Sequence, residues 1–135
     1  KVFTRFARWA GWRQRVAAEG EARRMVENPF GRKRYFYRGG NAPAMIGFVP
    51  QATVADAMWE VLSLMPKSIR ILAPLADALL IEHVGSLEVK WTKDMMEKRF
   101  DCIAPGFYFP CDVKQGVPGE SWGSIESKKE AEHAV

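Results

Sequence analysis

Apolar positions recur at three- and four-residue steps along the first part of the chain, which predicts an amphipathic helix. The apolar positions are Val2, Phe3, Phe6, Trp9, Ala10, Val16 and Ala17. The pattern weakens toward Val26 and ends at Asn28-Pro29, because a residue before proline disfavours the α conformation. No capping residue precedes this helix, so we expect the chain to start inside a larger structure.

Two further helices are predicted, over Gln51–Met65 and Leu87–Cys102, and Pro66 ends the first of them. Between the first and second helices, basic and aromatic residues alternate in FGRKRYFY, Phe30–Tyr37, which is typical of a strand. Asn41–Pro50 contains two prolines and a glycine, and we expect it to be irregular.

The apolar run LAPLADALLIEH contains one aspartate, Asp77. We interpret it as two strands, Ile69–Leu75 and Ala78–Val84, that form an antiparallel hairpin with its turn at Ala76-Asp77. The apolar residues on both strands predict that at least one face packs beneath helices. A last strand is predicted over Phe107–Val113. The order of elements predicts an α+β fold, with an antiparallel palm-type sheet and a central hairpin packed against helices.

Composition and charge narrow the class of protein. The 135 residues are 47% hydrophobic and contain only two cysteines, which favours one globular domain in a reduced, cytoplasmic compartment. No apolar run approaches the roughly 20 residues of a membrane helix, so no membrane partner is expected. The first forty residues carry eleven Lys or Arg and three acids, whereas the remainder has more acids than bases. A basic segment of this kind indicates a polyanion partner, with nucleic acid the first candidate.

Asp77 is a candidate for metal chemistry. A carboxylate at the tip of a buried hairpin is fixed in position yet accessible to a ligand, and Mg²⁺ binds one or two such carboxylates together with substrate phosphates. Aspartates from different strands hold the two metals of many phosphoryl-transfer enzymes. The alternative is a turn aspartate that bonds to its own backbone.

Four segments, in order, carry a resemblance to a known family: NPFGRKRYF, VPQATVADAM, PLADALLIEH and FPCDVKQGVPGESW. Together they resemble the C-terminal palm and fingers of family A DNA polymerases, the bacterial DNA polymerase I type and its phage relatives. The first is similar to the family's FGRRRY segment and the second to its PVQGTAADLM segment. The third occupies the place of the His-Asp-Glu hairpin, and the fourth resembles the closing strand and the G-x-x-W ending.

The resemblance implies roles for individual residues. Asp77 falls on a catalytic metal ligand, and Gln51 on the glutamine that approaches the primer–template minor groove. Arg32, Lys33 and Arg34 fall on the basic segment near template phosphates, in agreement with the charge asymmetry. Residues 1–123 would then form the palm/fingers segment, and residues 124–135 a polar, frayed C-terminal tail.

The same resemblance implies partners and cofactors. Expected partners are primer–template DNA, a deoxynucleoside triphosphate and the upstream polymerase portion, as another chain in a bacterial or phage-infected cell. That portion would supply the other catalytic aspartate and the triphosphate-binding finger helix, which have no counterpart here, and so complete a two-Mg²⁺ site with Asp77. Ala76 and Ala78 stand where the family has His and Glu, and Pro43 and Gly47 where it has an arginine and an asparagine.

Two questions stay open at this stage. The chain is either this polymerase portion or a catalytically silent nucleic-acid-binding module that kept the fold. Tyr35 and Tyr37 either stack on bases or belong to the core, and the β preference of aromatic residues favours the core. Asp56 is expected to be a surface or structural carboxylate, and Cys102 and Cys111 to be chemically inert.

Overall fold

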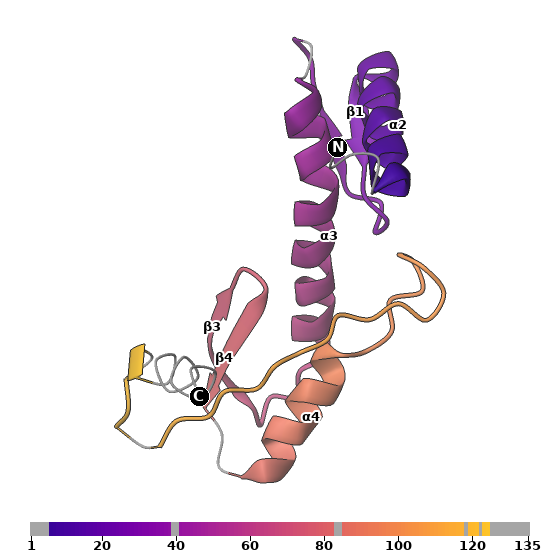
Figure 1. Cartoon of the computed structure of the whole chain (residues 1–135). Coiled ribbons are helices and arrows are strands. Elements are labelled where there is room, and N and C mark those ends of the chain that lie inside the picture. The colour runs from indigo at the N-terminus through magenta and orange to yellow at the C-terminus, as the bar shows by residue number, and fades with distance from the viewer. Residues whose placement is uncertain (1–5, 39–40, 83–84, 118, 122, 125–135) are drawn as a thin grey trace.

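A computed structural model describes residues 6–38, 41–82, 85–117, 119–121 and 123–124. One long helix, α3 (Ala42–Leu64), forms the axis of the molecule (Figure 1). Helix α2 (Ala7–Arg23) lies beside the beginning of α3, and α4 (Ser86–Met96) lies at its end. The strands of the described residues form two antiparallel pairs, β1–β2 and β3–β4. The predicted α+β class, antiparallel hairpins combined with helices, is confirmed.

Helix α2 ends earlier than the sequence pattern suggests. Arg24 adopts a left-handed conformation, with φ of 53°, and this turns the chain out of the helix before Val26. Met25–Glu27 then forms β1, which pairs with β2 (Lys33–Tyr35). The helix predicted up to Val26 and the single strand predicted over Phe30–Tyr37 are therefore both wrong in extent. Half of this short hairpin comes from residues expected to be helical.

Close packing joins this hairpin to the two long helices. A Cβ added at Gly20 of α2 would lie 2.6 Å from Met45 Sδ and 2.8 Å from Val26 Cγ1. Met45 on α3 is fully buried, and Val26 on β1 is nearly so. The absence of a side chain at Gly20 therefore lets α2, α3 and β1 approach one another.

Helix α3 begins at Ala42 and so includes nearly all of the segment Asn41–Pro50, which was expected to be irregular. The side chain of Asn41 caps the helix by accepting a hydrogen bond of 2.8 Å from the Ala44 amide. Pro43 is tolerated because the first helical amides need no partner within the helix, and Pro50 lies on an exposed position further along. The prediction failed because it treated both prolines as helix breakers.

The largest core cluster lies at the end of α3, where Ala57, Val61 and Phe100 are buried. Phe100 meets Phe109 edge to face, and Phe107 meets Phe109 in the same way, with centroids 5.7 and 5.0 Å apart. Helix α4 ends at Met96, six residues before the predicted end, and Phe107–Val113 is not a strand. Phe107 and Phe109 of this irregular segment pack against the core cluster instead.

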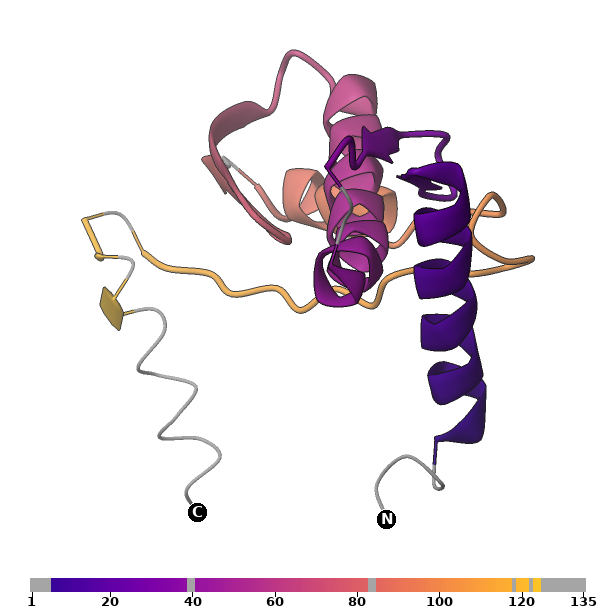
Figure 2. The same ribbon diagram turned by 90° about the horizontal axis from the view of Figure 1, so that it is seen from above.

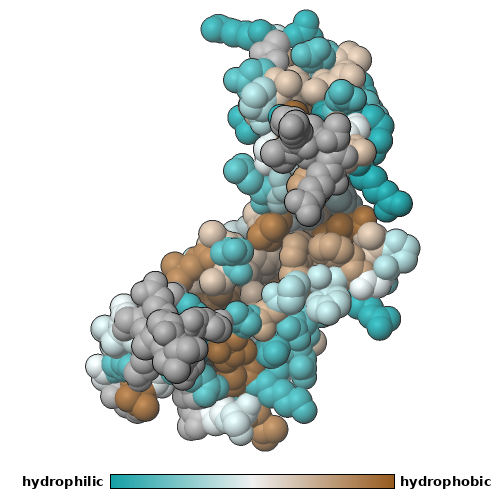
Figure 3. Space-filling model, viewed as in Figure 1, coloured by the Kyte–Doolittle hydropathy of each residue, from teal (hydrophilic) through white to brown (hydrophobic). Residues whose placement is uncertain are grey.

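Strand β3 (Arg70–Leu75) pairs with β4 (Ala78–Glu82) through a turn at Ala76-Asp77, which confirms the predicted hairpin. Five of the six β3 residues are exposed, whereas most of β4 is half buried. The helices therefore cover this apolar hairpin only in part, and hydrophobic surface gathers over the lower half of the molecule (Figure 3). Val84, the first five residues and most of the predicted polar tail, 125–135, lie outside the described residues.

Candidate nucleic-acid interface and hairpin aspartate

Asp77 lies at the exposed tip of the β3–β4 hairpin. Ala76 precedes it in a left-handed conformation, with φ of 49°, which a two-residue hairpin turn requires at its first position. Asp77 makes no hydrogen bond or ion pair with any residue that the structure describes, so the turn-bonding alternative gains no support. Its carboxylate is available to a ligand outside the chain.

The described residues contain no group of three or more His, Cys, Asp or Glu side chains that could hold a metal ion. Asp77 by itself offers one carboxylate, and Mg²⁺ sites at phosphates use one or two of them with water and substrate oxygens. A metal at Asp77 would therefore need further oxygen ligands, from a substrate and from other residues.

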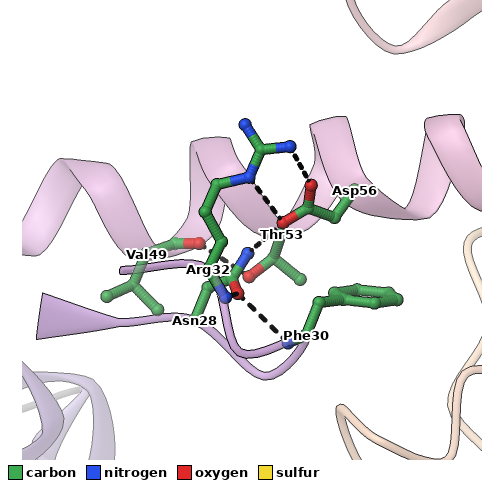
Figure 4. Close-up of polar contacts among 6 residues, drawn as sticks. All are labelled: Asn28, Phe30, Arg32, Val49, Thr53 and Asp56. Atoms are coloured by element: carbon green, nitrogen blue, oxygen red, sulfur yellow. Dashed lines mark hydrogen bonds and ion pairs between the residues drawn. The ribbon is translucent and has the colours of Figure 1, made fainter. Parts of the chain in front are cut away.

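A buried asparagine organises the loop of the β1–β2 hairpin (Figure 4). Asn28 Oδ1 accepts hydrogen bonds from the backbone amides of Phe30 and Arg32, at 3.1 and 2.8 Å. Asn28 Nδ2 donates to Asp56 Oδ2 on α3 at 2.6 Å. This one side chain shapes the loop and ties it to the helix.

Arg32 adds a second connection to the same carboxylate. Its Nε donates to Asp56 Oδ2 at 3.0 Å, and a terminal guanidinium nitrogen donates to Asp56 Oδ1. The Asp56 side chain is only 12% exposed, so this bidentate pair is partly shielded from water. Asp56 is thus structural, as expected, and it compensates the charge of Arg32, a predicted phosphate contact.

The next two basic residues point to different sides of β2. The Arg34 guanidinium lies 5.2 Å from the Phe36 ring and 5.9 Å from the Phe48 ring of α3. Lys33 is exposed, and its ammonium lies 3.8 Å from a Glu27 carboxylate oxygen. Arg32 and Arg34 therefore both contact α3, whereas the ion pair of Lys33 is with Glu27 on β1.

Tyr35 and Tyr37 contradict the expectation that they belong to the core. Their exposed fractions are 54% and 86%. The prediction was wrong because the alternate residue Arg34 is the one that reaches α3, where its guanidinium lies over the Phe48 ring, and the tyrosines lie on the other side of the strand.

The predicted site residues lie in separate parts of the fold. Gln51 is exposed on α3. Asp77 lies on the β3–β4 hairpin, which is on the opposite side of α3 from α2 in both ribbon views (Figures 1 and 2). The structure brings Arg32 and the α3 segment 49–58 together through Asp56, but it does not gather all five residues into one pocket.

The surroundings of Cys111 are those of a weakly reactive thiol. Cys102 and Cys111 are both free. Burial raises the pKa of the Cys111 thiol, and the nearby Glu97 carboxylate raises it further. A raised pKa keeps the thiol protonated and weakly nucleophilic at neutral pH, as expected for an inert cysteine.

Sequence reasoning missed Asn28. Its signal was present, because Asn followed by Pro and then Gly31 is typical of a turn in which the asparagine side chain bonds to backbone amides. Only the fold could reveal that the remaining amide hydrogens reach Asp56, twenty-eight positions away.

Comparisons with models of protein families, with curated proteins and with solved structures find no match to this chain. Among the described residues, no helix is both long enough and apolar enough to cross a membrane.

Proposed function

We propose that this chain is the C-terminal palm/fingers portion of a family A-type DNA polymerase. In this proposal Asp77 is one ligand of a two-Mg²⁺ site, and another chain supplies the second aspartate and the triphosphate-binding helix. In this proposal the primer 3′-hydroxyl would attack the α-phosphate of the incoming nucleotide, the bond to the β-phosphate would break and pyrophosphate would leave. Mg²⁺ held in part by Asp77 would supply positive charge beside the phosphate oxygens.

The placement of Asp77 carries the proposal. An acidic side chain stands at the exposed tip of an otherwise apolar hairpin and is not neutralised by any described residue. The hairpin itself has the features of an incomplete sheet, because Ile71, Leu72 and Leu75 of β3 are exposed. Further strands from a partner would cover these side chains and bring a second carboxylate to Asp77.

The packing around Asp56 gives a second line of support. The polymerase-like segments Asn28–Phe36 and Val49–Met58 contact each other directly, through hydrogen bonds from Asn28 and Arg32 to Asp56. Such a connection keeps the basic hairpin in a constant position relative to Gln51 on α3. That is useful to a protein that holds one DNA duplex with both segments.

The second candidate function is a catalytically silent nucleic-acid-binding module. Ala76 and Ala78 favour it, because they replace the two polar neighbours that the resembled hairpin has beside its aspartate. In this case the basic hairpin would still bind phosphates, and Asp77 would have no metal to hold.

Primer extension separates the two functions. The chain is combined with a polymerase portion that carries the second aspartate and the triphosphate-binding helix, and Asp77→Asn is compared with the wild type. Loss of one ligand of a phosphoryl-transfer metal costs several kcal/mol, so extension should fall by at least about a hundredfold.

Asp94→Asn is the matched control, because Asp94 is an exposed aspartate on α4, outside the hairpin. It should leave extension unchanged. Equal extension by the wild type and Asp77→Asn would reject the metal role and favour the silent module.

A further inference from the structure

Tyr35 and Tyr37 form an exposed pair of parallel rings beside the β1–β2 hairpin. Their ring centroids are 5.9 Å apart and their planes differ by only 15°. The two-residue period of a strand carries Lys33, Tyr35 and Tyr37 to one side of the chain, and the ring contact shows that the tyrosines do share a side.

These rings contribute little to the core. Tyr37 is 86% exposed, so folding removes only a small part of its surface from water. By contrast, their neighbour Phe36 is half buried, and its ring is in contact with the Arg34 guanidinium. A large aromatic surface left in water is better explained by a ligand than by stability.

The charge around the rings specifies the ligand. The segment Arg24–Arg38 contains five basic residues and one acidic residue, Glu27. Arg32 pairs with Asp56, and the Lys33 ammonium lies 3.8 Å from a Glu27 carboxylate oxygen. Arg24, Arg34 and Arg38 then leave the segment with a net positive charge. Aromatic rings flanked by positive charge are the combination with which proteins stack unpaired bases and neutralise the adjoining phosphates.

We propose that Tyr35 and Tyr37 form a stacking platform for the unpaired bases of single-stranded DNA, with Lys33 contacting the backbone. A base stacks on the outer face of Tyr37 and continues the ring stack that Tyr35 begins. The proposal rests on the DNA partner of the proposed function, but it requires neither a metal nor catalysis.

The firm attachment of the hairpin supports this role. The loop between β1 and β2 is held by Asn28 and Arg32 on Asp56, and by Phe30, whose ring meets Phe100 edge to face at 6.0 Å. The platform therefore stands on a rigid base, which reduces the ordering cost of binding.

Fluorescence anisotropy with a labelled oligothymidine tests the platform in the full 135-residue chain, without Mg²⁺. Tyr37→Ala should weaken binding by about tenfold, whereas Tyr37→Phe, which keeps the ring, should bind as the wild type does. Tyr108→Ala is the matched control, because Tyr108 is 52% exposed but lies in the C-terminal irregular segment. It should leave the affinity unchanged.

Salt dependence separates stacking from charge. Tyr37→Ala should lower the affinity at every salt concentration without changing the slope of log K against log salt. Lys33→Gln should reduce the magnitude of that slope by about 0.7, the value for one phosphate contact on a single strand. Binding to a blunt DNA duplex should be unaffected by Tyr37→Ala, because its bases are already stacked.

Absence of oligothymidine binding by the wild type, or equal losses in Tyr37→Ala and Tyr108→Ala, would overturn the platform. Binding to the platform is measured without Mg²⁺, the metal that Asp77 is proposed to hold. Failure of the platform is therefore distinguishable from failure of the polymerase proposal, which depends on extension and on Asp77.

Discussion

The composition of the two hairpins would suggest that the apolar one packs against the helices and the basic one does not, but the structure shows the reverse. The β1–β2 hairpin is basic and aromatic, yet buried side chains and a bidentate ion pair hold it against α2 and α3. The β3–β4 hairpin is almost wholly apolar, yet β3 is mostly exposed. Attachment therefore depends on whether a complementary surface is present, and the apolar hairpin meets only part of the surface that it could bury.

The difference corresponds to two kinds of function. A hairpin that is held firmly can present exposed rings and charge in a constant orientation, which suits direct contact with a ligand. A hairpin with exposed leucines and an aspartate that pairs with none of the described residues suits completion by another polypeptide. In the proposed function, the first contacts DNA and the second joins the rest of the catalytic centre.

The largest expected effect on stability comes from the packing beneath the first hairpin. Met45→Ala removes a fully buried side chain between α2, α3 and β1, and it should lower the free energy of unfolding by about 2–5 kcal/mol. The matched change in the second hairpin, Leu72→Ala, removes a side chain that is 50% exposed. Leu72→Ala should lower the free energy of unfolding by less than about 1 kcal/mol, since half of the leucine side chain is already in water. Urea denaturation measures both, and equal losses would refute the contrast between the hairpins.

A smaller effect is expected from the polar connections. Asp56→Ala leaves the buried amide of Asn28 without its acceptor and removes the Arg32 pair, and it should cost about 1–3 kcal/mol. Half of the Arg32 side chain is in water, so most of this cost arises at Asn28.

Glu82→Ala is the control, because it breaks the exposed Arg70–Glu82 ion pair of the second hairpin, with its 2.6 Å contact. Such pairs contribute at most about 1 kcal/mol. The double variant Asn28→Ala/Asp56→Ala should lose less free energy of unfolding than the sum of the losses of the two single variants, because each single variant already removes the hydrogen bond between these residues. Additive losses in thermal or urea denaturation would argue against the network.

The smallest effect concerns the turn that presents Asp77. Ala76 has a positive φ, which costs an L-residue more than glycine, so Ala76→Gly should raise the stability by about 0.5 kcal/mol. Ala78→Gly makes the same change two residues later, in the extended strand β4, and should lower the stability instead. A loss of stability in Ala76→Gly would mean that the turn does not have this conformation in solution.

Much of the fold follows from local chemistry in the sequence. The β3–β4 hairpin and the three helices were predictable, because their hydrophobic periods are read along a few consecutive residues. The ends of these elements were harder to predict. Arg24 ends α2 in a left-handed conformation that no sequence pattern indicates. Pro50 lies within α3, although proline usually ends a helix. Such features depend on packing with residues distant in the chain.

The sequence by itself determined the charge asymmetry, the helical and hairpin periods, and the isolation of Asp77 within an apolar run. Only the tertiary structure decided which polar residues have partners. It connected Asn28 and Arg32 to Asp56, turned Arg34 toward Phe48, and left Tyr35, Tyr37 and Asp77 in contact with water. Alternation along a strand gives two faces, but which face is covered depends on where the helices lie.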